Sequence, residues 1–215
     1  AGKTRLQGTL LGKKLGFQIG TYKIDELNTR LRLGGRRLAT QETSFRLNQQ
    51  PISVSGKLAL DPRLSGAIAL TSPTLNLDQL LDSIGNASTP PAVNADDSPP
   101  APQLPEILRD ATVAIEGVIT KGVYRGLEFS ELQLGFDYDQ QLARDYELSA
   151  VVAGGTLKSN GELNFQDLSR IAFDTRFELS EAQLEDLAPA IVGHRTAVSG
   201  LLSSAGSLAG SGGSG

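Results

Sequence analysis

The chain has 215 residues, enough for one large domain or two smaller ones with a buried core. Hydrophobic residues make up 39% and charged residues 20%, which excludes a fully disordered chain and a bundle of membrane-spanning helices. There is no Cys, no Met and no Trp, and His194 is the single histidine. Disulfides, thiolate metal sites, thiol nucleophiles and multi-His centres within this chain are therefore excluded, and we expect no enzyme and no cofactor.

The net charge of −4 conceals an uneven distribution of charge along the chain. Residues 1–63 hold 12 basic and 4 acidic residues, a balance of +8, whereas residues 64–215 hold 8 basic and 20 acidic residues, a balance of −12. A basic half can approach anionic lipid, and the alternative is two ordinary solvated surfaces. Because no aromatic residues interleave with the basic ones and no recognition motif occurs, nucleic acid is not an expected partner.

Alternation with a period of two dominates the chain and predicts antiparallel strands with one apolar face. Residues 27–33 and 132–138 alternate most clearly. Further strands are expected near residues 6–11, 45–47, 52–60, 113–119, 146–152, 156–165 and 171–177. The Gly pairs at 34–35 and 154–155 predict hairpin turns or bulges, since no phosphate-loop residues follow them.

Each half is expected to close with a short amphipathic helix. Asn76 predicts a cap for the first helix, with Gln79 at its third position, and Ser180 with Gln183 predicts a capping box for the second. Pro189 is expected to end or kink the second helix. These helices should cover the sheet or plug one end of its apolar face.

Residues 85–105 separate the two halves and hold six of the ten prolines, which predicts an extended linker. On either side the sequence repeats itself. Residues 24–27 match 129–132 at an offset of 105, which also aligns 56–60 with 161–165, and an offset of 104 then aligns 71–82 with 175–186. A preserved register over this length predicts a tandem duplication, whose units 6–84 and 111–191 should superimpose in one extended sheet.

The predicted fold class is therefore mainly β with minor α. Two tandem antiparallel β-meander repeats join as a curved, groove-forming sheet, each followed by a short amphipathic helix. The predicted organisation is a first β repeat with its helix (1–84), a Pro-rich flexible linker (85–105), a second β repeat with its helix (106–192), and a further strand unit or flexible tail (193–215). The absent initiator Met and the Gly, Ser, Leu and Ala composition of residues 206–215 suggest a segment of a longer protein.

No motif in the sequence indicates a catalytic site. His194 would need a nucleophile and an orienting carboxylate, and no motif supplies them. The acidic residues between positions 174 and 186 do not fit a calcium loop. A candidate headgroup-binding basic patch consists of Arg30, Arg32, Arg36 and Arg37, and its alternative is a charged edge that discourages strand-to-strand aggregation.

The stretch from Ser72 to Leu81 (SPTLNLDQLL), ahead of a Pro-rich linker, resembles a segment of AsmA-like proteins of Gram-negative bacteria. AIEGVITKGVYRG at 114–126, followed by LEFSEL, GGTL at 154–157 and NGEL at 160–163, resembles the C-terminal module of that family. Residues 198–212 resemble the start of its next strand unit. The resemblance covers most of the chain, although its motifs are short and carry no catalytic signature.

The resemblance implies a periplasmic module of an inner-membrane-anchored parent protein, whose β groove carries phospholipid toward the outer membrane. The expected partners are phospholipid acyl chains and, through the sheet edges, other envelope proteins. The alternative function is a structural or protein-interaction scaffold in outer-membrane protein assembly. The residues expected to line the groove are Leu27, Leu31, Leu33, Ile52, Val54, Leu58, Leu60, Leu132, Leu134, Phe136, Leu163 and Phe165.

Overall fold

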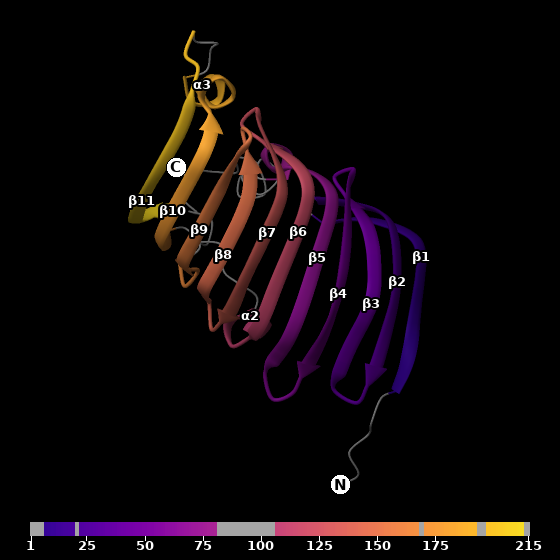
Figure 1. The fold of residues 1–215 in the computed structure, drawn as a ribbon. Helices are drawn as coiled ribbons and strands as arrows, with labels where there is room; N and C mark the ends of the chain where they lie inside the picture. The colour runs from indigo at the N-terminus through magenta and orange to yellow at the C-terminus, as the bar shows by residue number, and fades with distance from the viewer. Residues whose placement is uncertain (1–6, 20–21, 81–105, 168–169, 193–196, 213–215) are drawn as a thin grey trace, which may run out of the picture.

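The structure, a computed structural model, describes residues 7–19, 22–80, 106–167, 170–192 and 197–212. The described residues are mainly strand, and the strands form one open sheet of eleven strands in sequence order (Figure 1). The strands are β1 (Gln7–Ile19), β2 (Tyr22–Gly34), β3 (Arg37–Leu47), β4 (Gln50–Leu60), β5 (Leu64–Asn76), β6 (Thr112–Tyr124), β7 (Leu127–Asp139), β8 (Leu142–Val152), β9 (Gly155–Asn164), β10 (Ile171–Gln183) and β11 (Leu201–Gly212). The expected mainly-β class and the single extended sheet are confirmed.

Every neighbouring pair of strands is antiparallel except β5 and β6, which pair in parallel from Ser65 opposite Thr112 to Asn76 opposite Val123. The expected antiparallel pairing holds within β1 to β5 and within β6 to β11, and the sequence predicted no direction for the pair that joins these two sets. Two strands that follow each other in the chain and pair in parallel need a crossover connection between them. The sequence prediction also omitted β5, where Gly66 and Pro73 interrupt the alternation.

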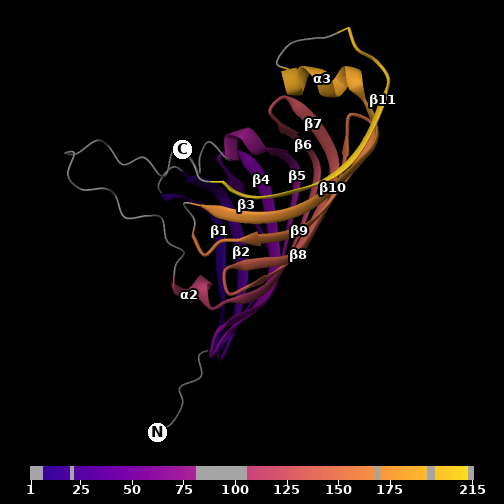
Figure 2. The same cartoon turned by 90° about the vertical axis from the view of Figure 1, so that its left-hand side faces the viewer.

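The sheet is strongly curved and twisted, so that β3 to β5 run steeply in Figure 2 while β9 and β10 run across it. Left-handed residues at Glu26 (φ 55°), Glu131 (φ 54°) and Glu181 (φ 57°) each coincide with a register shift in a neighbouring pair. Such β-bulges bend a strand and increase its twist. The bulges therefore contribute to the curvature that gives the sheet a concave face.

The predicted turns at both Gly pairs are confirmed. Gly35 (φ 67°) lies between β2 and β3, and Ala153 with Gly154 (φ 50° and 75°) joins β8 to β9. The positive φ at both Ala153 and Gly154, and at the first central residue Gly35 of the other turn, is typical of two-residue turns that match strand twist.

Helical segments lie near the strand ends. Residues 77–80 are helical, and the amide of Gln79 donates to Oδ1 of Asn76 at 3.0 Å, so the expected cap is present. The remaining helices are α2 (Glu106–Arg109) and α3 (Leu184–Val192). The predicted capping box of α3 is wrong, because Ser180 belongs to β10 and the helix begins only at Leu184. Pro189 lies inside α3 and does not end it.

Buried side chains gather where the upper ends of β5 to β8 and β10 meet α3. The cluster comprises Leu75, Ile119, Phe129, Ala150, Val152, Ala182 and Leu187, with Leu77 packed against it. Elsewhere the sheet is largely a single layer whose two faces differ in chemistry. This contrast between faces defines the candidate site.

Candidate functional site

Strand register divides the side chains into two faces, because directly paired residues in neighbouring strands point to the same side of a sheet. We call the face that carries the buried cluster the inner face. Leu187 of α3 packs on it, and the hydroxyl of Tyr138 donates to the carbonyl of Leu108 in α2 at 2.8 Å. Figure 2 shows α2 on the hollow side of the curved sheet, so the inner face is the concave one.

On the inner face, directly paired residues form rows that run across neighbouring strands, and the rows through β4 to β8 are apolar. One row passes through Val54, Leu70, Gly117, Leu134 and Leu148 in β4 to β8. The neighbouring inner row contains Gly56, Ile68, Ile115 and Phe136. Leu70, Leu134 and Leu148 are half-buried, so part of each side chain stays open to the hollow. From β4 to β8 the inner face therefore presents a largely hydrophobic lining, and Thr43 and Ser159 continue the first row on either side.

The register assigns eleven of the twelve residues expected to line a groove to this one face, and a ring contact places the twelfth, Phe165, beside it. Eleven lie within strands, and Phe165 directly follows β9 with its ring centroid 6.5 Å from that of Tyr138. Their burial varies, from Ile52 at 7% exposure to Leu60 at 44%. The structure brings these residues to a common surface, and their role in ligand binding stays a prediction.

The sequence prediction missed other apolar residues on the inner face. They are Leu10, Leu15, Phe17, Phe45, Ile68, Leu70, Val113, Ile115, Phe129, Leu148, Phe173 and Phe177. Several were missed because a bulge changes the parity of the strand. Phe129 and Leu132 are three residues apart, yet they pair with Gly122 and Ile119 and join one cluster, since Glu131 adopts a left-handed conformation between them. The repeated Glu-Leu at 26–27 and 131–132 was the available signal.

Polar groups on the inner face satisfy one another. Thr43 Oγ1 lies 2.6 Å from Thr29 Oγ1 and 2.9 Å from Thr40 Oγ1. In the second half, the Tyr146 hydroxyl lies 2.9 Å from Ser159 Oγ and in short contact with Thr175 Oγ1. Hydroxyls paired in this way place little unsatisfied polarity in an apolar lining.

Helical segments close the upper end of the hollow. Both carboxylate oxygens of Asp78 accept the backbone N–H of Arg125 at 2.9 Å, which ties residues 77–80 to the turn between β6 and β7. At α3, Oε2 of Glu185 accepts the N–H of Gly200 at 3.3 Å. A cleft of about 1430 Å³ lies between α3 and the ends of β4 to β8, lined by apolar Leu75 and Phe129 and by polar groups such as Gln50.

The lower end carries α2. Partial burial raises the pKa of Tyr138 above its ordinary value of 10.0, opposed by a hydrogen bond with the backbone of Gln141. A neutral phenol is the form that donates to Leu108, so the shift in pKa and the contact with α2 agree.

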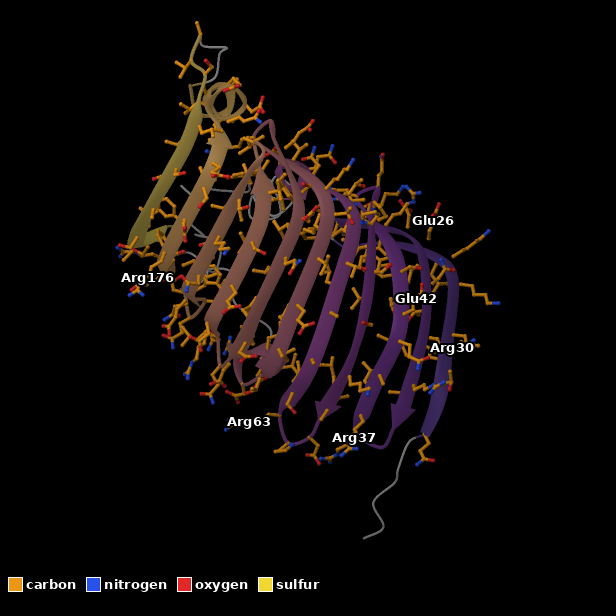
Figure 3. All side chains as sticks on the ribbon, viewed as in Figure 1. Glu26, Arg30, Arg37, Glu42, Arg63 and Arg176 are labelled. Carbon is orange, nitrogen blue, oxygen red and sulfur yellow. The ribbon has the colours of Figure 1, made fainter. Side chains whose placement is uncertain are left out.

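The outer face is mostly polar, although it exposes Leu11 and Val118, and the balance of charge on it differs between the two halves of the sheet. Register assigns Arg30, Arg32, Arg37 and Lys57 to the outer side of β2 to β4. On β6 to β10 the outer residues include Glu116, Asp137, Glu147, Glu162, Asp174 and Glu178, with Arg144, Lys158 and Arg176 among them, so acidic residues are in excess there but not alone. Figure 3 shows Arg37 and Arg63 near the lower ends of the first strands, and Arg176 at the opposite side of the sheet.

The candidate headgroup patch is therefore not brought together with the apolar lining. Arg30 and Arg32 lie on the opposite face from Leu31, and Arg36, in the turn, forms an ion pair with Asp61. The patch, if it binds an anion, does so on the convex side or at the rim. His194 and the linker residues 85–105 lie outside the described residues, so the structure does not position them.

No family model, no curated protein and no solved structure matches this chain. Among the described residues, no helix combines the length and apolarity needed to cross a membrane. In the same part of the chain, no three His, Asp or Glu side chains gather in a way that would hold a metal ion. The candidate functional site is thus the inner face itself.

Proposed function

We propose that this chain is a non-enzymatic groove module that binds phospholipid through its acyl chains. In this proposal it lies in the periplasm as part of an inner-membrane-anchored protein, and it passes lipid between the inner and outer membranes in support of outer-membrane biogenesis. The location, the anchor and the transport step rest on the resemblance to AsmA-like proteins. Acyl binding rests on the inner face.

The observation that carries the proposal is the asymmetry between the two faces of a single-layer sheet. Removing apolar surface from water contributes about 25 cal/mol of favourable free energy per Å². Large exposed apolar areas on proteins therefore mark sites of interaction. The middle rows of the inner face, including Leu134 and Ile115, keep part of their surface open. An acyl chain along these rows would cover that surface without needing a specific polar partner.

Single tryptophans test acyl binding directly, because the chain has none of its own. Leu134→Trp puts the indole on the inner face, and Gln133→Trp puts it on the outer face of the same strand. Phospholipids brominated on the acyl chain should quench Leu134→Trp and leave Gln133→Trp unchanged. Equal quenching, or none with either variant, would contradict the proposal.

A chain-length series distinguishes acyl binding from headgroup binding. Each buried CH₂ contributes about 0.8 kcal/mol, so each added carbon should strengthen binding of a lysophospholipid by up to about fourfold. Ile115→Asp should abolish this dependence, whereas Ala114→Asp, its neighbour on the outer face, should preserve it. Binding that is independent of chain length would point to headgroup recognition.

A structural scaffold in outer-membrane protein assembly is the second candidate. The division of charge on the outer face favours it, since opposite charge guides association between proteins. A photocrosslinker attached to Arg32→Cys in cells should then capture an outer-membrane β-barrel protein. Capture of lipid alone would exclude the scaffold.

We further propose that the two halves are a tandem duplication. The bounds of β1, β2 and β3 recur in β6, β7 and β8 at an offset of 105, and the bulges at Glu26 and Glu131 share that offset. The last strand of each repeat, β5 and β10, aligns at a different offset from the one expected. Gly56 pairs with Ile68 and Gly161 with Thr175, so β10 follows β5 at an offset of 107, not 104. The longer connection between β9 and β10 accounts for the change.

A further inference from the structure

The two edges of the sheet are formed by β1 and β11, each of which has one neighbouring strand in the described part of the chain. An edge strand presents unpaired backbone N–H and C=O groups, and proteins commonly protect it with Lys, Pro, bulges or short length. β11 has twelve residues with no Pro and no charged side chain. It is an edge suited to pairing with another strand. β1 carries Lys13 and the left-handed Lys14 at a register shift, so only its regular part, residues 7–12, offers a comparable edge.

We propose that β11 of one copy of this chain pairs with β1 of a second copy, head to tail, so that the sheet continues from copy to copy. This proposal does not depend on lipid binding, since it concerns the edges and not the inner face.

Strand direction permits the arrangement without turning the sheet over. The alternating antiparallel pairs and the parallel pair β5–β6 make β1 and β11 run in opposite directions. The β1 strand of a second copy in the same orientation therefore meets β11 as an antiparallel neighbour. The inner faces of both copies then lie on the same side.

The side chains at the two edges are complementary in size. The inner side of β1 carries Gly8 and Leu10, and that of β11 carries Gly206 and Leu208. Leu10 and Leu208 are 56% and 57% exposed. The register with Leu10 opposite Gly206 places Leu208 opposite Gly8, where an added Cβ would meet no atom within 4 Å. It places Leu10 beside the ring of Phe177, which lies 3.0 Å from the Cβ position of Gly206.

The charges near the two edges are opposite in sign. β1 and β2 carry five basic residues (Lys13, Lys14, Lys23, Arg30 and Arg32) and two acidic ones (Asp25 and Glu26). β10 and β11 carry three acidic residues (Asp174, Glu178 and Glu181) and one basic one (Arg176). Like charge disfavours β1 pairing with a second β1, whereas unlike charge favours β11 pairing with β1.

Cysteine exchange between two differently labelled proteins tests the pairing, because the chain contains no Cys. Thr9→Cys on β1 and Ser207→Cys on β11 are both exposed and lie opposite each other in the inferred register. After mixing and mild oxidation, the mixed disulfide should far exceed the two homodimers. Random collision gives only twice as much mixed product as either homodimer, and that result, or dominant homodimers, would overturn the proposal.

Two controls separate pairing from misfolding and from chance contact. Gln133→Cys, exposed in the middle of the outer face, should form little disulfide with either variant. In sedimentation, Arg30→Glu should weaken self-association several-fold, and mixing it with Glu178→Arg should restore it. A wild-type chain that remains monomeric at every concentration would overturn the proposal whatever the result of lipid-binding experiments.

Discussion

The ring of Phe129 occupies the space that a side chain on Gly122 would need. The two residues pair directly between β7 and β6, and a Cβ on Gly122 would come within 2.6 Å of Phe129 Cε2 and 2.7 Å of the carbonyl oxygen of Leu75. The oxygen belongs to the backbone of β5 and has little freedom to shift. The pair therefore fixes the closest packing at the upper end of the inner face.

Gly122→Ala should lower the free energy of unfolding by about 1–3 kcal/mol, the usual cost of overpacking. Gly135→Ala on β7 is the matched control, because a Cβ added there would have no atom within 4 Å. Chemical denaturation of both variants gives the comparison. Equal stability of the two would show that the upper cluster can relax around the added methyl.

The bulge at Glu131 predicts a reversal in the ranking of substitutions. Its φ of 54° suits Gly and strains a β-branched residue, so Glu131→Val should be less stable than Glu131→Gly by about 1–2 kcal/mol. At Gln133, on a regular part of the same strand, Val should instead be more stable than Gly. The same ranking at both positions in urea denaturation would argue against the bulge.

Tyr138 predicts a pH dependence of stability. Because burial raises its pKa in the folded state, the folded chain holds the phenol proton more tightly than the unfolded chain does. The resulting stability is present below the ordinary pKa of 10.0 and is lost as the pH rises through the folded-state value. The stability difference between wild type and Tyr138→Phe should therefore shrink above about pH 10.

The contact between Tyr138 and Leu108 also holds α2, so Tyr138→Phe should increase proteolytic cleavage near residues 106–109 at neutral pH. Tyr124→Phe, at an exposed tyrosine of β6, is the control. It should change neither the pH dependence of stability nor the cleavage near residues 106–109. Unchanged cleavage in Tyr138→Phe would show that the hydrogen bond to α2 contributes nothing to its position.

The hydroxyl groups of Tyr146, Ser159 and Thr175 contact one another, so removing two of them should lower the free energy of unfolding by a non-additive amount. Tyr146→Phe or Thr175→Val should each cost about 1 kcal/mol, the net worth of a typical hydrogen bond. The double variant should cost less than the sum, because the two hydroxyls share partners. Thr156→Val, at an exposed position of β9, should be near neutral. Strict additivity in thermal denaturation would contradict a shared network.

Arg30 and Arg32 on the outer face should play no part in acyl-chain binding by the inner face. Because Arg30 and Arg32 lie on the face opposite the apolar lining, replacing both with Gln should leave acyl-chain binding unchanged. The quenching of Leu134→Trp by brominated phospholipid is the measurement. A large loss of quenching would mean that lipid headgroups reach around the β1 edge to the outer side.

Much of the fold was predictable where a local rule decides the outcome. Alternation assigned Leu31 and Leu134 to an apolar face, since side chains in a strand alternate whatever the strand pairs with. Glycine at position 154 and the Asn76 cap were predictable for a similar reason, because a turn and a helix start each depend on a few adjacent residues. The offset of 105 likewise matched the bounds of the first three strands in each half.

The sequence by itself therefore determined most of the strands, though not β5, as well as the apolar face and the turns at Gly35 and Gly154, through interactions between residues close in the chain. Only the tertiary structure decided that β5 and β6 run parallel, that Phe129 and Leu132 share a face, and that the apolar face is concave. It also decided that Ser180 stays in a strand paired with Thr156 instead of capping a helix. These outcomes depend on pairing between distant segments, whose hydrogen bonds and packing outweigh local preference.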